Sequence, residues 1–326
     1  MSVRILSSLL IIFLGLFSGY LLRLLYQKNH RLLPFSLDSV RKQSQRITLL
    51  FFMPILFTLT VWVVNFKSIK IAFLPLLGVF ELFIGGIFAL LIANFLRYHW
   101  KKKGSFIICG TFANLGGIGG LVCYMLLGEK GFAYVPIYTL FVSLSFFSVG
   151  LPLTKIFSHS HTQDANFLNA FIRGLKDIYV IIALISVAIG IMLNLYKIPR
   201  PEYISKITAF LIPFTNYIIL FSIGTGIQLS KIRLYLIESL WLSLVRYLLV
   251  PLAVISIALV LGYSHIDDGL LLKAIIILSA MPMANNSVIA ASLYGLDLDL
   301  ANSAYIFTTL LLFLVVPILF VLIDKL

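Results

Sequence analysis

The chain consists largely of apolar runs long enough to cross a lipid bilayer, and these runs constrain its fold more than any other feature. Of its 326 residues, 61% are hydrophobic and 11% are charged, whereas a soluble globular protein is about half apolar and a quarter charged. So much apolar surface excludes a soluble fold, and no stretch is left over for a separate soluble domain. The first run, residues 5–26, is too long for a signal peptide, so we interpret it as a membrane helix.

The apolar runs predict ten membrane-spanning helices, and the expected fold class is therefore all-α and polytopic. The longest loop follows the fifth helix, and its partly amphipathic stretch NFLNAFIRGL predicts a helix that lies on the membrane surface. The predicted spans are residues 4–26, 47–66, 70–97, 105–127, 132–156, 177–196, 204–229, 235–262, 269–294 and 299–323.

Basic residues are concentrated in the loops on one side of these helices. The net charge is +13, and placing the N-terminus outside puts fifteen Lys and Arg residues in cytoplasmic loops against nine on the other side. This bias follows the positive-inside rule and predicts that both termini lie outside. The lipid bilayer, through its anionic headgroups, is thus the expected partner of the basic loops, and nucleic acid is not.

The two halves of the chain resemble each other in three places that occur in the same order. RITLLFFMP returns as KITAFLIP, SGYLLRLLY as IGIMLNLY, and IYTLFVSLSFFSVGLP as AYIFTTLLLFLVVP. Each half holds five predicted helices, an odd number, so the second half enters the membrane upside down. We therefore expect an inverted repeat of residues 1–156 and 177–326, joined by a cytoplasmic loop over 157–176, which is typical of secondary transporters. Chance similarity between leucine-rich segments is the alternative.

The repeat pairs the fourth predicted helix with the ninth, and both carry residues that disrupt a helix at mid-depth. Asn114 precedes a cluster of glycines in the fourth, and Pro282 precedes polar residues in the ninth. Because proline removes a backbone donor and clustered glycine weakens a helix, we expect both helices to unwind and cross. Freed backbone groups cannot face lipid, and half-helix N-termini favour an anion, which predicts a substrate site. The alternatives are glycine-mediated helix packing and a simple proline kink. The predicted substrate-binding residues are Asn114, Gly116, Gly117, Pro282, Asn285, Asn286, Ser287 and, from the seventh helix, Asn216.

Glu81 and Arg246 lie in the middle of the third and eighth predicted helices, which are also repeat partners. A charge at the bilayer centre is costly, so it should pair or line an aqueous path. Three interpretations stay open: an ion pair that ties the repeats together, Glu81 as the carrier of a coupling proton or sodium ion, and Arg246 as the attractor of an anionic substrate. The five histidines lack metal-ligand spacing, and no nucleophile–base pair is found, so the sequence predicts no metal site, no other cofactor and no enzyme.

Four segments resemble the auxin efflux carrier family. GTFANLGGIGG followed by LLGEKGFAYVPIY is similar to that family's fourth helix and loop, and SAMPMANNSVIAASLYGLDLDLANSAYIFTT to its ninth helix. SQRITLLFFMPILF and FSIGTGIQL resemble its second and seventh helices. These segments lie in the family's order and spacing over most of the chain.

The resemblance implies a fold of two inverted five-helix repeats with crossed, broken fourth and ninth helices. Helices one, two, six and seven would form a scaffold that often dimerises, and the others a transport domain that moves like an elevator. The implied activity is secondary transport of small organic anions, such as carboxylates or auxin-like weak acids. Asn114, Pro282 and the region of Asn285 match the crossover positions that bind substrate.

The sequence departs from the family in three places. Leu121 stands where the family has proline in the fourth helix, and Lys176-Asp177 replaces Asn-Pro before the sixth. The long hydrophilic central loop of plant auxin exporters is absent. With Leu121 in place of the proline, only glycines are left to break the fourth helix. The absence of the long central loop favours a compact prokaryotic carrier of the cytoplasmic membrane, within the bile acid, arsenite and riboflavin transporter superfamily. A sodium-coupled symporter of the bile-acid type and a membrane sensor built on a carrier fold are the alternatives.

Overall fold

A computed structural model describes residues 2–29, 36–66, 68–158, 172, 174–227 and 229–326. Over these residues the chain is helical, with no strand beyond one isolated backbone bridge. Eight helical segments are long and apolar enough to cross a membrane, which confirms a polytopic integral membrane protein. They are Leu9–Lys28, Leu37–Val61, Ile69–Phe95, Tyr134–Ile156, Ile178–Leu195, Tyr203–Gly224, Ile232–Val260 and Leu298–Lys325.

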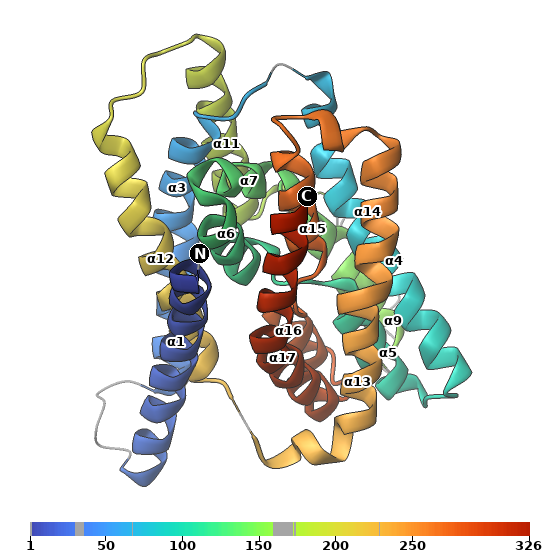
Figure 1. The fold of residues 1–326 in the computed structure, drawn as a ribbon. Helices are drawn as coiled ribbons and strands as arrows, with labels where there is room; N and C mark the ends of the chain where they lie inside the picture. Colours follow the sequence, from blue (N-terminus) through green and yellow to red (C-terminus); the bar gives the residue numbers. More distant parts are fainter. Residues whose placement is uncertain (1, 30–35, 67, 159–171, 173, 228) are drawn as a thin grey trace.

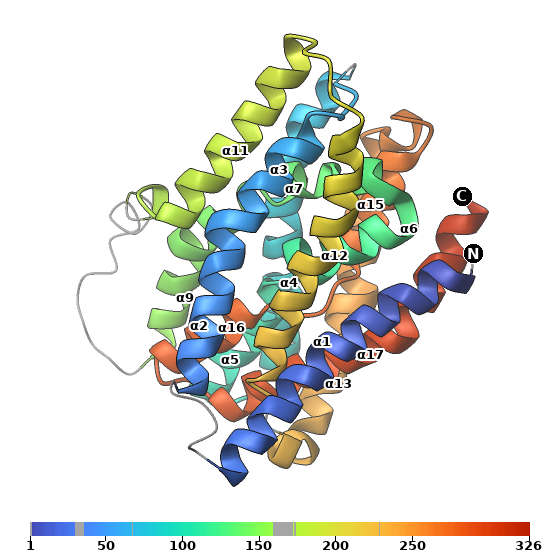
Figure 2. The ribbon, with the colours of Figure 1, turned by 90° about the vertical axis from the view of Figure 1, so that its left-hand side faces the viewer.

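One group of helices lies together on the left of Figure 1, and Figure 2 faces it directly. Within it α1 packs along α12, and α3 packs along α11. Small residues allow the first contact, because a Cβ on Gly19 would lie 2.0 Å from the carbonyl oxygen of Phe221. The group consists of α1 (Ser2–Lys28), α3 (Met53–Val61), α11 (Ile178–Leu195) and α12 (Tyr203–Gly224).

The remaining long helices form a second group on the right of Figure 1. Helix α4 packs against both α5 and α14, and again glycine permits the contact: a Cβ on Gly85 of α4 would lie 2.4 Å from the carbonyl oxygen of Gly110 in α5. The main members are α4 (Leu74–Phe95), α5 (Trp100–Thr111), α13 (Leu236–Leu244), α14 (Val250–Val260) and α17 (Leu298–Lys325).

Three helices widen into a π-helical turn two residues before a proline. These turns are η2 (Thr48–Phe52) before Pro54, η5 (Phe146–Gly150) before Pro152 and η7 (Val245–Leu249) before Pro251. Proline lacks the N–H of a regular turn and its ring clashes with the carbonyl four residues earlier, and the wider turn relieves that clash. Pro213 and Pro317 lie inside α12 and α17 without such a turn.

The second predicted span was wrong at its start. The sequence predicts that it begins at residue 47, but α2 (Leu37–Ile47) continues directly into it, so the helical run starts at Leu37. Helix α2 has no buried residue and its apolar and charged side chains lie on opposite faces, which hid it among loop residues. The surface helix predicted within 158–176 falls mostly outside the described residues.

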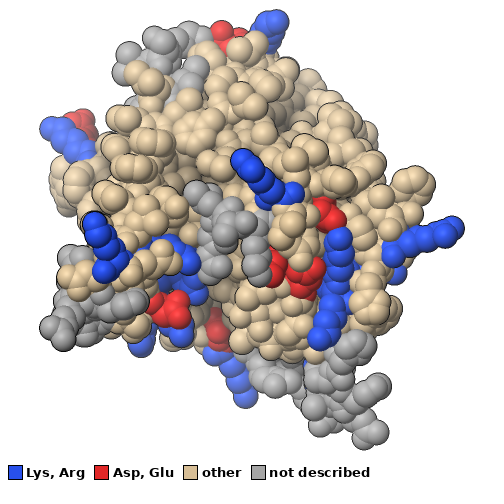
Figure 3. Space-filling model, turned by 90° about the horizontal axis from the view of Figure 1, so that it is seen from below, with Lys and Arg blue, Asp and Glu red and all other residues tan. Residues whose placement is uncertain are grey.

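Lysine and arginine gather at the lower end of the molecule, as Figure 3 shows from below. Toward this end in Figure 1 lie the C-terminal ends of α1 and α12 and the link that joins α4 to α5. These segments lead into three of the four loops that the positive-inside rule predicts to be cytoplasmic. Most of the fourth, over residues 157–176, lies outside the described residues.

Candidate functional site

The fourth and ninth predicted spans are both interrupted, and their interruptions pair with each other. The ninth leaves the helix between α15 (Leu270–Ser279) and α16 (Asn285–Leu293). The fourth leaves it between α5 and the π-helical turn η4 (Leu115–Gly119), which continues into α6 (Gly120–Phe132). Between them, Ala113 and Met283 form an antiparallel bridge. Two segments about 170 residues apart in sequence therefore meet at one point.

The bridge satisfies the backbone groups that the two interruptions release. The Asn114 N–H donates to the Pro282 carbonyl at 2.8 Å, and the Ala284 N–H donates to the Phe112 carbonyl at 2.8 Å. Met283 is fully buried and Ala113 nearly so. Backbone groups without partners would be very unfavourable at this depth, so pairing the breaks makes both of them tolerable in a membrane.

The local cause of each break differs. Pro282 cannot donate to the preceding turn, which ends α15. The fourth-span break lies earlier than its glycines, at the extended residue Phe112. Asn114 then starts the next helix by accepting the Ile118 N–H on its side-chain Oδ1 at 3.2 Å. We expected the glycines to open this helix, but the helix opens before them, so the expected position was wrong. Asn114 caps the new helix at the break, and the glycines lie in the turn after it.

The residues after the first break differ in the space around them. Asn114 is half-buried. A Cβ on Gly116 would meet no atom within 4 Å, whereas one on Gly117 would lie 2.7 Å from Oδ1 of Asn114 and 3.5 Å from Ile219 of α12. Of the two glycines, only Gly116 faces room that a small ligand can occupy. Gly117 instead allows η4 to approach α12.

Residues after the second break point in different directions. Asn285 is half-buried and Asn286 is exposed. Ser287 is fully buried, and its hydroxyl donates to the Ile108 carbonyl of α5 at 2.9 Å, which fastens α16 to α5. Pro282 is buried within the bridge. The structure thus brings Asn114 and Pro282 together, while Ser287 serves packing between the two spans.

Asn216 of α12 is 1% exposed and lies one turn before Ile219, the residue that faces η4. Its Nδ2 donates to the Ile212 carbonyl of its own helix at 2.8 Å. Its Oδ1 is buried and has no hydrogen-bond partner among the described residues. A buried carbonyl oxygen without a hydrogen-bond donor costs free energy. A ligand or a water molecule in the site can supply that donor.

Glu81 and Arg246 form an ion pair beneath the bridge. Arg246 Nη2 lies 2.6 Å from Glu81 Oε1, and both side chains are fully buried. Tyr138 donates its hydroxyl to the other carboxylate oxygen at 2.7 Å, and Arg246 Nε donates to the Met281 carbonyl at 3.2 Å. The network joins α4, α7 (Tyr134–Tyr138) and η7 to the residue before Pro282.

Tyr138 and the Met281 carbonyl were missed by the sequence reasoning. The two ions of a buried pair have further lone pairs and N–H groups that need hydrogen-bond partners. This need was the signal that could have pointed to polar groups on neighbouring spans. No residue pattern singles out Tyr138 among the tyrosines. The carbonyl of Met281 carries no side-chain signal, although the proline after it indicates a disturbed turn.

A second ion pair connects α6 to the segment between α11 and α12. Arg200, between α11 and α12, contacts both carboxylate oxygens of Glu129 in α6 at 2.5 and 3.2 Å. Thr208 of α12 donates to Glu129 at 2.6 Å. Gly128, just before the glutamate, has a φ of +73°, a backbone angle that favours glycine.

At the basic end, Lys102 of α5 lies 2.5 Å from Glu238 of α13, and its ammonium group lies 4.5 Å above the ring of Tyr98. Burial and the nearby carboxylate of Glu238 raise the pKa of Tyr98 to about 12. Glu238 is 8% exposed, so protein encloses most of this residue. No group of three His, Cys, Asp or Glu in the described part of the chain is placed to hold a metal ion.

Comparison with known proteins gives two matches. Residues 177–320 match the sequence profile of a family described as membrane transport protein. An uncharacterized transporter of Methanocaldococcus jannaschii is 24% identical over 241 residues, which are 73% of this chain and 74% of that protein. The family match contains the ninth-span break with Pro282, Asn285 and Asn286.

Proposed function

We propose that this chain belongs to the membrane transport protein family that its second half matches, and that it is a secondary active transporter for small organic anions, such as carboxylates or auxin-like weak acids. The observation that carries the proposal is the bridge between Ala113 and Met283, which brings two interrupted membrane segments to one point. A pair of broken helices that meet at mid-depth is a common construction of carrier binding sites. The family match and the transporter relative also favour a transporter over an enzyme. Transport needs no covalent chemistry.

The polarity of the meeting point favours an anion. Helical structure restarts at Leu115 and at Asn285, directly after the bridge, so two helix N-termini lie at the same place. Each N-terminus carries free N–H groups and about half a positive charge. Asn114 and Asn285 add amide groups, and Gly116 leaves space beside them. A carboxylate is the small ligand that these donors recognise best.

The two interrupted spans complete a ten-helix fold. Adding α5 with α6, and α15 with α16, to the eight long segments gives ten crossings, five in each half. We propose that residues 1–156 and 177–326 are inverted repeats joined by residues 157–176. The antiparallel sense of the bridge supports this, because inversion makes equivalent segments run in opposite directions.

The grouping of the helices supports an elevator mechanism. Helices α1, α3, α11 and α12 correspond to the proposed scaffold, which we expect to dimerise, and the second group to the transport domain. The Glu129–Arg200 ion pair connects α6, which we assign to the transport domain, to the segment before α12 of the scaffold. We place the protein in the cytoplasmic membrane of a prokaryote with both termini outside, on the charge bias of its loops.

Coupling to a proton or to sodium is tested by flux. A thermal-shift screen of carboxylates on the purified protein selects a ligand, because a compound that binds the folded state raises the unfolding temperature. Uptake of that ligand into proteoliposomes is then measured with imposed pH or sodium gradients. Flux that follows the pH gradient supports proton coupling, and flux that ignores pH but collapses without sodium supports the bile-acid type of symport. Tight binding without flux would contradict transport and favour a sensor.

A further inference from the structure

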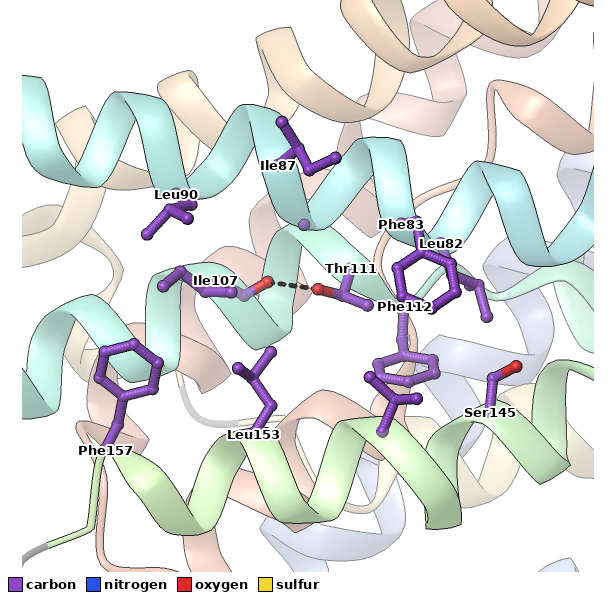
Figure 4. Close-up of a pocket in the computed structure, with 12 residues that line it drawn as sticks. Leu82, Phe83, Ile87, Leu90, Ile107, Thr111, Phe112, Ser145, Leu153 and Phe157 are labelled. Carbon is purple, nitrogen blue, oxygen red and sulfur yellow. Dashed lines mark hydrogen bonds between the residues drawn. The ribbon is translucent and has the colours of Figure 1, made fainter. Parts of the chain in front are cut away.

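An apolar groove of about 270 Å³ runs between α4, α5 and the segment from η5 to α9 (Leu151–Ile156). Figure 4 shows it edged by side chains from all three, with Phe83, Ile87 and Leu90 of α4 along one side. Its few hydroxyl groups include that of Thr111, which donates to the Ile107 carbonyl within α5. Apart from Thr111 and Ser145 the walls present hydrocarbon, and no cationic side chain lines them, so this groove does not suit the transported anion.

The groove opens on the lipid-facing side of the protein. Phe83 is 48% exposed, Ile87 49% and Leu90 36%, and all three lie on a helix that spans the membrane. Exposed apolar side chains on such a helix face acyl chains. The occupant with access to the groove is thus the hydrocarbon tail of a membrane lipid.

One end of the groove carries the features of a headgroup site. Phe157 closes this end, and its ring lies 4.7 Å from that of Trp100 at an angle of 45°. The Trp100 indole N–H donates to the Ile156 carbonyl at 3.3 Å. Tryptophan in this position is typical of the membrane interface. Lys103 lies one helical turn before Ile107, which lines the groove, so it shares that face of α5. Unlike Lys102, it has no ion pair among the described residues.

We propose that this groove binds the acyl chain of an anionic phospholipid whose phosphate contacts Lys103 beside Trp100. The neutral lining selects hydrocarbon, and the basic end selects a negative headgroup in the leaflet of the basic face. The inner end of the groove reaches Phe112, whose carbonyl holds the bridge to the ninth span. A bound lipid therefore contacts the residue at which the fourth span breaks. The proposal does not depend on the identity or the existence of a transported anion.

Fluorescence quenching tests the site directly, because the chain has three tryptophans. Replacing Trp62 and Trp241 by phenylalanine leaves Trp100 as the reporter. The protein is placed in phosphatidylcholine vesicles that contain, at equal mole fraction, either phosphatidylglycerol or phosphatidylcholine brominated near the carbonyl end of the acyl chain. We expect brominated phosphatidylglycerol to quench Trp100 at least threefold more effectively.

Two variants with matched controls locate the effect. Lys103→Gln should bring the ratio of the two lipids close to one, while Lys130→Gln on the opposite end leaves it unchanged. Val149→Phe fills the groove and should weaken quenching by both lipids, whereas Val260→Phe on the exposed surface of α14 has no effect. Equal quenching by the two lipids in the parent protein would overturn the proposal. So would quenching that depends on protein density rather than lipid class, which indicates that a second copy covers the groove.

Discussion

Arg246 donates its Nε to the carbonyl oxygen of Met281, the residue just before the proline that breaks the ninth span. The same guanidinium holds the Glu81 carboxylate through Nη2 at 2.6 Å. One buried cation thus satisfies a carboxylate in α4 and a backbone group released at the break. The ion pair and the break form a single construction, so a change to one should be felt by the other.

The first prediction separates stability from transport in this network. Arg246→Leu leaves Glu81 buried without its partner and should destabilise the protein by about 3–5 kcal/mol. The double variant Glu81→Gln/Arg246→Leu should recover most of this loss, since Tyr138 can still hydrogen-bond the amide. Thermal unfolding in detergent measures both effects.

Uptake by the same double variant shows which role the pair has. Recovery of stability with transport still lost is expected if Arg246 positions the break through Met281. Recovery of both stability and pH-coupled transport would contradict this role. A Glu81→Gln variant that stays folded but no longer responds to a pH gradient would instead identify Glu81 as the proton carrier.

The second prediction compares two glycines. Gly116→Leu should abolish uptake with little change in the unfolding temperature, because its side chain enters space where no atom lies within 4 Å of the Cβ. Gly85→Ala should instead lower the unfolding temperature, because its Cβ would lie 2.4 Å from the Gly110 carbonyl oxygen. Normal uptake by a folded Gly116→Leu protein would place the substrate elsewhere.

The third prediction concerns movement between the helix groups. Glu129 of α6 and Arg200 beside α12 contact each other, so cysteines at these two positions should be joined by a short bis-maleimide. Linking them should stop uptake by the Glu129→Cys/Arg200→Cys variant, since an elevator must separate the groups. The native thiols Cys109 and Cys123 are buried and should not react.

Single cysteine variants treated with the same reagent provide the control for this experiment. Each should lose the ion pair but keep uptake after treatment, so that any block is due to the link itself. Full uptake by the linked double variant would show that the α6 end and α12 do not move apart, and would contradict the elevator mechanism.

Much of the fold follows from hydrophobic length, and the break at Pro282 follows from the chemistry of proline. The break in the fourth span was harder to place, because Leu121 stands where the auxin efflux carrier family, which the sequence resembles, has a proline, and the glycines suggested a later position. The actual opening depends on tertiary pairing: the Phe112 carbonyl and the Asn114 N–H bond to the other segment. Such pairing has no local signature.

The side-chain partners at the site could be predicted only in part. The Glu81–Arg246 pair was one of three interpretations that the cost of charge in a membrane left open, and the structure contains it. Whether Ser287 faces the ligand or α5 depends on the rotation of α16, which a polar run does not specify. The helix start at Leu37 was hidden for a related reason, since a charged amphipathic segment has a low mean hydropathy.

Uptake by asparagine variants tests the central claim most directly. Radiolabelled carboxylate, chosen by thermal shift, is measured in proteoliposomes with the parent protein, Asn114→Ala, Asn285→Ala and, as a control on the exposed end of α4, Asn94→Ala. The parent and the Asn94 variant should transport. The other two should fall to background while remaining folded, because the lost cap at Asn114 costs only about 1 kcal/mol. Near-normal uptake by both variants would contradict a substrate site at the paired breaks.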